Sequence, residues 1–176
     1  PTQPLQACDT NNDGREIFDL TLSELDILDV RHYNLIVSYY SSMADLEAQN
    51  NRITNPTSYS NISNPQTVFV RLTNTISNCY LSLPLEFRIN VPPTINSITN
   101  VTICHNASNS SDLTEVNSLW VNDSANLVFK YYASNSDALA DINTLNTNFI
   151  YSSNNTLLYV RVENSLTGCF ATKSFR

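Results

Sequence analysis

The chain has little glycine, little histidine and few charged residues, and these shortages exclude several classes of function. Of its 176 residues only two are glycine, two are histidine and 14% are charged. Two glycines are too few for a Gly-rich phosphate-binding loop or a nucleophile elbow. Both histidines are expected in exposed loops, where neither serves as a catalytic base. The sequence therefore predicts a non-enzymatic protein.

Positive charge and long apolar runs are also scarce. Nine Lys and Arg face sixteen Asp and Glu, a net charge of −7, and the basic residues are scattered. Such a chain does not neutralise a row of phosphates, so neither nucleic acid nor an anionic membrane is an expected partner. No apolar run approaches about eighteen residues and no signal peptide is present, so no membrane insertion is expected. A start at proline instead of methionine predicts a processed or excised fragment.

What the chain does contain is one segment that occurs twice. Val68–Cys79 reappears as Leu158–Cys169, and in each copy apolar and polar residues alternate before a polar turn. This period of two predicts a strand that returns as a hairpin. The repeat predicts two domains, 1–91 and 92–176, of which the second is expected to be truncated at its C-terminus. Domains of this size bury a core with little margin, so extra stabilisation is expected.

Other segments recur in the same order in both copies and indicate the fold class. Two β-rich runs end in Tyr-Tyr, and each is followed by a Ser-x-x-Asp helix-start signal at Ser42 and Ser134. Thr21 with Glu24 three residues later predicts a capping box at an earlier short helix. Strands that alternate with one or two short helical crossings predict an all-β protein made of two tandem immunoglobulin-like β-sandwich domains.

The four cysteines occupy matching places in the two copies. Cys8 and Cys104 lie near the start of each copy, and Cys79 and Cys169 lie near its end. The repeat predicts disulfides between Cys8 and Cys79 and between Cys104 and Cys169. A zinc site is the alternative, but the chain has no Cys-x-x-Cys pair. Disulfides indicate an oxidising compartment.

The loop after Cys8 resembles the start of a calcium-binding loop. Asp9, Asn11, Asp13 and Gly14 match the D-x-[DN]-x-[DN]-G pattern, in which alternate acidic side chains supply oxygen ligands. We expect one structural calcium ion in the first copy, with ligands from Asp9, Asn11 and Asp13, the Arg15 carbonyl, and Asp19 or Glu16 closing the shell. The twelfth position is leucine instead of glutamate, so this is no complete EF-hand. A polar turn without an ion is the alternative.

The tyrosine and arginine side chains of the repeated strands are candidates for ligand contact. Tyr39, Tyr40, Tyr131 and Tyr132 offer aromatic faces to a sugar, although one tyrosine of each pair is expected in the core and the other on the opposite sheet face. Arg71 and Arg161 are expected to bridge to carboxylates or to cross-strand partners.

The motifs, taken in order, resemble a known group of bacterial repeats. Cys-Asp-x-Asn-x-Asp-Gly, Phe-Asp-Leu-Thr, Tyr-Tyr-x-Ser-x-x-Asp and Val-Arg-x-x-Asn with a later Cys resemble tandem immunoglobulin-like repeats of secreted surface proteins of Bacteroidetes, particularly flavobacteria. These are adhesin-like, gliding-motility-associated proteins exported by type IX secretion. The second copy departs from the pattern because it lacks the Asp-Gly loop.

The resemblance implies an extracellular or cell-surface location and a function as stalk, spacer or adhesive repeat. The implied partners are neighbouring repeats of the same polypeptide, surface glycans or other cell-surface proteins. Asp123-Ser124-Ala125 resembles the O-glycosylation motif of Bacteroidetes, which makes Ser124 a candidate glycosylation site. The alternative function is a carbohydrate-binding module attached to a secreted hydrolase.

Overall fold

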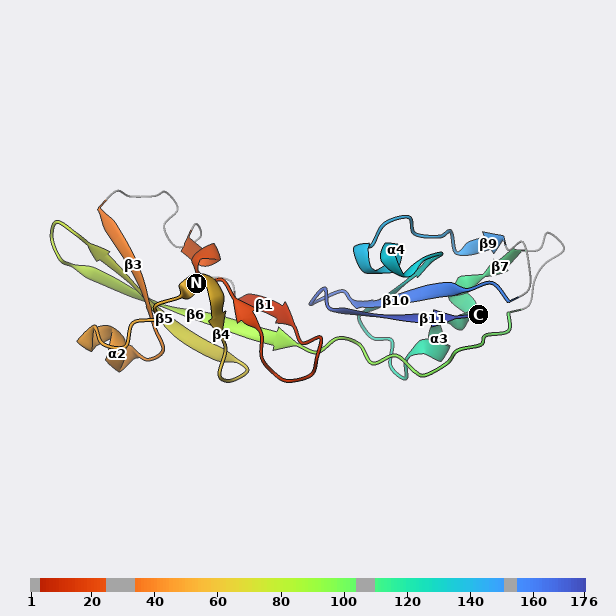
Figure 1. Ribbon diagram of the computed structural model, residues 1–176, viewed down its shortest axis with the longest axis horizontal. Helices are drawn as coiled ribbons and strands as arrows, with labels where there is room; N and C mark the ends of the chain where they lie inside the picture. Colours follow the sequence, from red (N-terminus) through yellow and green to blue (C-terminus); the bar gives the residue numbers. More distant parts are fainter. Residues whose placement is uncertain (1–3, 25–33, 104–109, 151–154) are drawn as a thin grey trace. The chain divides into compact units, whose positions relative to one another are not determined.

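The computed structural model describes residues 4–24, 34–103, 110–150 and 155–176. The chain divides into two compact units, Pro1–Val91 and Pro92–Arg176 (Figure 1), and each is described here by itself. No helix in the described residues is long and apolar enough to cross a membrane.

Unit 1 is built on a four-stranded sheet. Its strand order is β1-β6-β5-β3, with β1 at Leu5–Cys8, β6 at Tyr80–Asn90, β5 at Gln66–Asn74 and β3 at Leu35–Tyr40. A short two-stranded ladder joins β2 (Ile17–Phe18) to β4 (Tyr59–Ser60). The described residues of unit 1 also form three short helices: η1 (Leu20–Ser23), α2 (Met43–Ala48) and η2 (Pro56–Ser58).

The repeated segment forms the centre of this sheet. β5 pairs antiparallel with β6 from Gln66↔Phe87 to Thr73↔Tyr80, and β3 pairs antiparallel with the other edge of β5. β1 runs parallel to the end of β6. The predicted strand and hairpin return are therefore confirmed.

Unit 2 repeats this plan, with fewer strands among its described residues. A three-stranded antiparallel sheet has the order β11-β10-β8, with β11 at Phe170–Phe175, β10 at Leu158–Asn164 and β8 at Leu127–Tyr132. β7 (Ser110–Asp112) pairs with β9 (Asn148–Ile150). The helices are η3 (Leu113–Val116), α3 (Asn117–Trp120) and α4 (Asn135–Ala140).

Each unit has its own apolar core on one face of its main sheet. In unit 1, Phe18 and Leu20 cover the inward side chains of β5 and β6, and the Phe18 and Phe87 ring centroids lie 4.8 Å apart. In unit 2, Trp120 fills the same role, with its ring 4.8 Å from that of Phe175. The alternation seen in the sequence places the core side chains of β5, β6 and β10 on one face of their sheet, because successive strand side chains point to opposite faces.

The all-β, two-repeat prediction is confirmed, and the structure also shows how each repeat is layered. Opposite the main sheet lie a short two-stranded ladder and small helices. The second layer is thus much smaller than a full sheet of an immunoglobulin-like sandwich.

Two helix-start predictions have different outcomes. Ser42 and Ser134 are the N-caps of α2 and α4, and each hydroxyl accepts the amide hydrogen of the aspartate three residues later. The capping box at Thr21 is wrong: η1 begins two residues earlier, where the Asp19 carboxylate accepts the Thr21 amide hydrogen. Asp112 caps η3 in the same way.

Candidate functional site

The two cysteine hairpins share one backbone geometry. In unit 1 the Asn74 amide donates to the Cys79 carbonyl at 2.9 Å, and in unit 2 Asn164 donates to Cys169 at 2.8 Å. The Asn74 and Asn164 side chains each accept the amide hydrogen of the residue two positions on, at 2.9 Å. The residue before each cysteine has a positive φ, 58° at Asn78 and 72° at Gly168. The turn therefore holds both cysteines at equivalent positions.

The cysteines themselves differ in state. Cys8 and Cys169 are both disulfide-bonded, whereas Cys79 carries a free, exposed thiol. Cys104 and its predicted bond lie outside the described residues. The predicted pair of Cys8 with Cys79 is therefore wrong.

Strand geometry explains this correction. Cys8 ends β1 opposite Asn90, the last residue of β6, whereas Cys79 directly precedes Tyr80, the first residue of β6. An extended strand rises about 3.3 Å per residue, so the 11 residues of β6 separate the two cysteines by far more than the Cα separation of about 7 Å that a disulfide tolerates. The sequence repeat shows that the cysteines occupy matching positions in the two copies, but it does not show how far Cys8 lies from Cys79.

An exposed apolar residue marks the tip of each cysteine hairpin. Ile76 is 75% exposed and Leu166 is 72% exposed, each three residues before the cysteine. Neither side chain contributes to a core. Sequence reasoning missed these residues, although an apolar residue inside two otherwise polar turns was a visible signal.

The Asp9 loop is closed by its own hydrogen bonds. The Asp9 carboxylate is 5% exposed and accepts the amide hydrogens of Asp13 at 3.1 Å and Gly14 at 3.0 Å. Asn11 accepts from the Asp13 amide, and the Asp13 carboxylate accepts from the Arg15 amide at 2.7 Å. Asn61 then holds the loop to the rest of unit 1 by donating to the Gly14 carbonyl.

The predicted calcium ligands lie in the Asp9 loop and at the start of η1. Asp19 bonds to the amide and hydroxyl of Thr21 at the start of η1. Among the described residues no group of three or more His, Cys, Asp or Glu side chains is placed to hold a metal, so Asp9, Asp13 and Asp19 do not form one. Asp9 accepts backbone amide hydrogens in this structure, and one structural calcium ion held by the five predicted residues stays a prediction.

Replacing Asp9 with alanine tests this function of the loop. The variant is expected to lose about 1–3 kcal/mol of unfolding free energy, because two amides in a partly buried loop lose their acceptor. Thermal unfolding of wild type and variant, each in calcium and in EDTA, measures the loss. Asp123→Ala, which removes a single hydrogen bond in an exposed turn of unit 2, is the control. A melting temperature that falls in EDTA for wild type but not for Asp9→Ala would support the calcium prediction.

All four tyrosines of the Tyr-Tyr pairs are buried. Their exposed fractions are 4% or less: Tyr39 2%, Tyr40 4%, Tyr131 2% and Tyr132 0%. Burial and the Glu24 side chain raise the pKa of Tyr39, and burial raises the pKa of Tyr131 to about 12. As predicted, Tyr39 and Tyr131 lie in the cores, and the next residue of each strand lies on the opposite sheet face, where it is buried too. These rings do not form an exposed platform for a sugar.

A buried arginine links the repeated strand to a helix in each unit. Arg71 donates to the Leu46 carbonyl at 3.1 Å and lies 3.6 Å from the Tyr80 ring centroid. Arg161 donates to the Ala138 carbonyl at 3.1 Å and lies 3.3 Å from the Phe170 ring centroid. Each guanidinium therefore donates to a carbonyl near the C-terminal end of α2 or α4.

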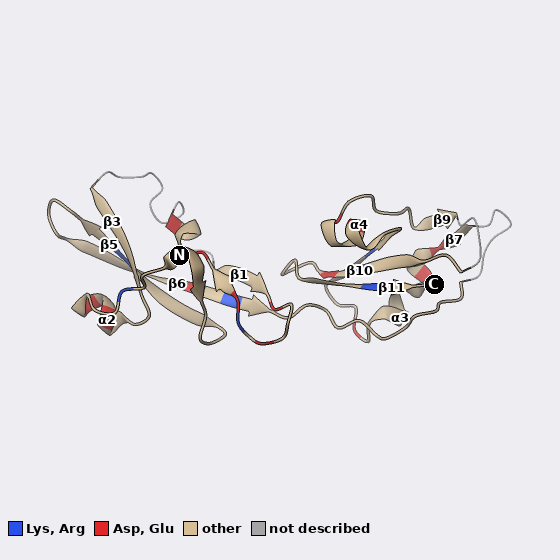
Figure 2. Ribbon diagram, viewed as in Figure 1, with Lys and Arg blue, Asp and Glu red and all other residues tan. Residues whose placement is uncertain are grey.

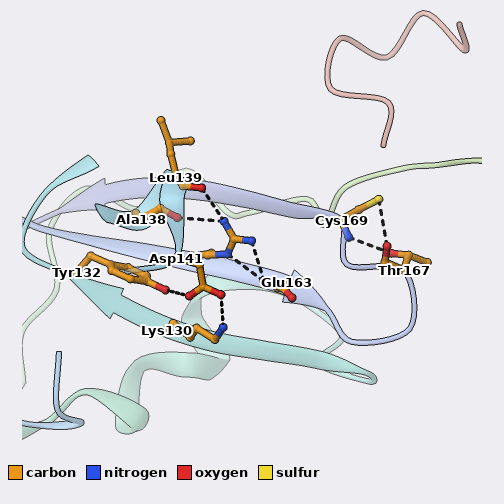
Figure 3. A network of polar contacts seen from close by, with 9 residues as sticks. Lys130, Tyr132, Ala138, Leu139, Asp141, Glu163, Thr167 and Cys169 are labelled. Atoms are coloured by element: carbon orange, nitrogen blue, oxygen red, sulfur yellow. Dashed lines mark hydrogen bonds and ion pairs between the residues drawn. The ribbon is translucent and has the colours of Figure 1, made fainter. Parts of the chain in front are cut away.

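Unit 2 adds a polar network around this arginine (Figure 3). Arg161 pairs with Glu163 at 2.8 Å, as expected for a nearby carboxylate. Asp141 accepts from the Lys130 ammonium at 2.6 Å and from the Tyr132 hydroxyl. Hydrogen bonds from Lys130 and then Tyr132 hold the pKa of Asp141 below its usual range. Every group of this network has a structural partner, so the network favours a packing function over chemistry.

The remaining candidate residues lie on the surface. Ser124 is exposed in a turn in which Asp123 accepts the Ala125 amide hydrogen. Figure 2 shows the Lys and Arg residues and the Asp and Glu residues scattered over both units.

Comparison with known families gives a match in each unit. A family model described as the Flavobacterium inter-domain disulphide bond domain matches residues 4–94 and again residues 100–176. The two matches cover nearly the whole chain. A search of curated proteins found no match. The chain therefore consists of two flavobacterial repeats, and it belongs to the Flavobacterium inter-domain disulphide bond domain family.

Proposed function

We propose that this chain is a non-enzymatic stalk, spacer or adhesive segment of a secreted or surface-anchored protein, whose repeats are joined by disulfides. One observation carries the proposal. Cys8 in unit 1 and Cys169 in unit 2 are disulfide-bonded, while Cys79, the other cysteine of unit 1, has a free thiol. We propose that Cys8 pairs with Cys169, as the family's description of an inter-domain disulphide suggests.

A covalent link between repeats suits a protein that bears load or spans a distance. Small domains are only marginally stable, and a disulfide keeps neighbouring domains connected when one of them opens locally. Disulfides persist in oxidising environments outside the cytoplasm. An extracellular location, with export by type IX secretion and a part in adhesion or gliding, is consistent with this chemistry and with the flavobacterial family.

The described side chains support a structural function more than catalysis. The buried tyrosines, arginines and Asp141 are occupied by contacts within their own unit. Burial of the four paired tyrosines leaves the carbohydrate-binding alternative without its proposed platform. Neighbouring repeats, surface glycans or other surface proteins remain the proposed partners.

A tryptic map without reductant tests the proposed pairing. Cleavage after Lys and Arg places each cysteine on a separate peptide: 1–15, 72–88, 89–130 and 162–173. The oxidised chain, first treated with iodoacetamide, is expected to give 1–15 linked to 162–173, and to give 72–88 alkylated at Cys79. A link between 1–15 and 72–88, or alkylation of Cys8 before reduction, would contradict the proposal. Reduction before alkylation is the control, because it releases all four peptides.

Binding separates a spacer from an adhesive repeat. The oxidised chain is applied to an array of surface glycans, with a Ser124→Ala variant to detect any contribution of that site. Absence of binding supports a spacer. Glycan binding by the chain with its disulfide intact that is lost on thermal unfolding supports an adhesive repeat.

A further inference from the structure

The buried arginine of unit 1 has no acidic partner, although its counterpart in unit 2 has one. Arg161 pairs with Glu163 at 2.8 Å. The matching residue of unit 1, two positions after Arg71, is Thr73, whose hydroxyl accepts the Arg71 Nε hydrogen at 3.2 Å. Arg71 is only 6% exposed, and no carboxylate of the described residues forms an ion pair with it. Unit 1 therefore buries a positive charge without a counter-charge beside it.

The positions around the two arginines differ in charge in the same direction. In unit 2, Lys130 lies opposite the arginine and pairs with Asp141, which caps the end of α4 (Figure 3). The matching residues of unit 1 are neutral: Ser38 lies opposite Arg71 on β3, and Gln49 caps the end of α2. Two carboxylates thus balance two cations in unit 2, whereas one cation alone remains in unit 1. A buried charge without a partner is costly, so an anion from outside the chain would be stabilised there.

One nitrogen of Arg71 is available to such an anion. Nε donates to Thr73 and Nη1 donates to the Leu46 carbonyl at 3.1 Å, but Nη2 has no hydrogen-bond partner among the described residues. Every side-chain nitrogen and oxygen that is shielded from water in the described part of the chain has a partner, so Nη2 reaches the surface. In unit 2 the same nitrogen donates to Glu163. The nitrogen that binds a carboxylate in unit 2 is thus accessible from outside in unit 1.

Two exposed apolar side chains flank this nitrogen. Thr73 lies between Ile36 on β3 and Tyr80 on β6, and directly paired side chains point to the same face of a sheet. Ile36 is 51% exposed and Tyr80 is 47% exposed. The Tyr80 ring also contacts the guanidinium of Arg71, whose Cζ lies 3.6 Å from the ring centroid. Apolar and aromatic side chains around a few fixed polar groups are the usual composition of a small-molecule site.

We propose that unit 1 binds an acidic sugar, a hexuronate of a surface glycan, at Arg71. The sugar carboxylate takes the position that Glu163 takes in unit 2 and accepts hydrogen bonds from Nη2 and from the Thr73 hydroxyl, which both donates and accepts. The sugar ring lies against Tyr80 and Ile36. A hexuronate fits this arrangement because its carboxylate is attached directly to a ring that carries apolar C–H groups. The inference deepens the proposed function and rests on its adhesive form, in which surface glycans are partners.

An NMR titration of the whole isotope-labelled, oxidised chain with trigalacturonate tests the inference. The amide signals of Thr73 and Tyr80 and the Nε–H signal of Arg71 are expected to shift together. Trigalacturonate is expected to bind at least about tenfold more tightly than its fully methyl-esterified form, which has the same rings without the charge. Acetyl-triglutamate amide has as many carboxylates but no sugar ring, and it is expected to bind at least about fivefold more weakly than trigalacturonate.

Thr73→Glu supplies a carboxylate from within the chain, as Glu163 does in unit 2, and keeps Arg71 in place. This variant is expected to bind trigalacturonate at least about tenfold more weakly than wild type. Thr67→Glu is the matched control, because Thr67 is exposed on the same strand and lies about 20 Å from Thr73. It adds the same charge and is expected to bind as wild type does.

Three results would each overturn the inference: equal affinity of wild type for trigalacturonate and its methyl ester, equal or tighter binding of the glutamate peptide, and unchanged binding by Thr73→Glu. The first and second of these use wild type alone, so they hold even if a variant fails to fold. The tryptic map tests the disulfide between the repeats separately. Failure of the hexuronate site is therefore distinguishable from failure of the proposed function.

Discussion

Replacing Arg161 with methionine is expected to lower the unfolding free energy of unit 2 by about 3 kcal/mol. The guanidinium is only 6% exposed and donates to the carbonyls of Ala138 and Leu139. Methionine keeps much of the side-chain volume but donates no hydrogen bond. Two carbonyls and the partly buried Glu163 carboxylate then lose their partner, and each unsatisfied acceptor costs about 1–3 kcal/mol.

Lys130→Met is the matched control for this prediction. Lys130 lies directly opposite Arg161 on the neighbouring strand, but its side chain is 31% exposed in its ion pair with Asp141. Loss of a half-exposed pair is expected to cost about 1 kcal/mol or less. Urea unfolding followed by fluorescence of Trp120, the single tryptophan, reports on unit 2. Equal losses in the two variants would contradict a special contribution from the buried arginine.

Replacing Trp120 with alanine is expected to lower the unfolding free energy of unit 2 by about 4 kcal/mol, the largest effect predicted for this chain. Its side chain is fully buried, lies against the Phe175 ring and donates to the Tyr131 hydroxyl at 3.0 Å. Alanine removes this contact area, leaves a cavity and leaves the Tyr131 hydroxyl without its donor. The unfolding free energy of a small domain is roughly 5–15 kcal/mol in total. Unit 2 of this variant is therefore expected to unfold near room temperature or at a low urea concentration.

Circular dichroism in urea measures this loss, because the variant has no tryptophan. Leu119→Ala, the preceding position with a 41% exposed side chain, is expected to change stability by about 0.5 kcal/mol or less. Trp120→Phe retains a ring against Phe175 and is expected to fall between the two. A loss of less than about 1 kcal/mol for Trp120→Ala would show that the tryptophan is not central to the core.

Local features of the fold were predictable because they follow from short-range chemistry. The alternation in Val68–Cys79 predicted β5 and its return, and the structure confirms both. The Ser-x-x-Asp signals at Ser42 and Ser134 predicted helix starts because a hydroxyl accepts a free amide hydrogen locally. The same local rule failed at Thr21, since Asp19 offers the same acceptor two residues earlier.

Features that depend on distant residues were less predictable. Whether both tyrosines of a pair are buried depends on what covers the two faces of β3 and β8, and all four are buried. Tyr39 reaches the Leu20 carbonyl and Glu24, whereas Tyr132 reaches Asp141 beyond α4. Alternation alone does not indicate that both faces of a strand are covered.

By itself the sequence determined that this protein consists of two β-rich repeats with cysteines in matching places, since repetition and alternation are properties of the chain alone. Only the tertiary structure decided which cysteines bond. β6 is too long for Cys8 to reach Cys79, so the disulfide of Cys8 lies elsewhere and Cys79 keeps its thiol. Distances between residues far apart in the chain depend on strand length and direction, and these are set when the sheet forms.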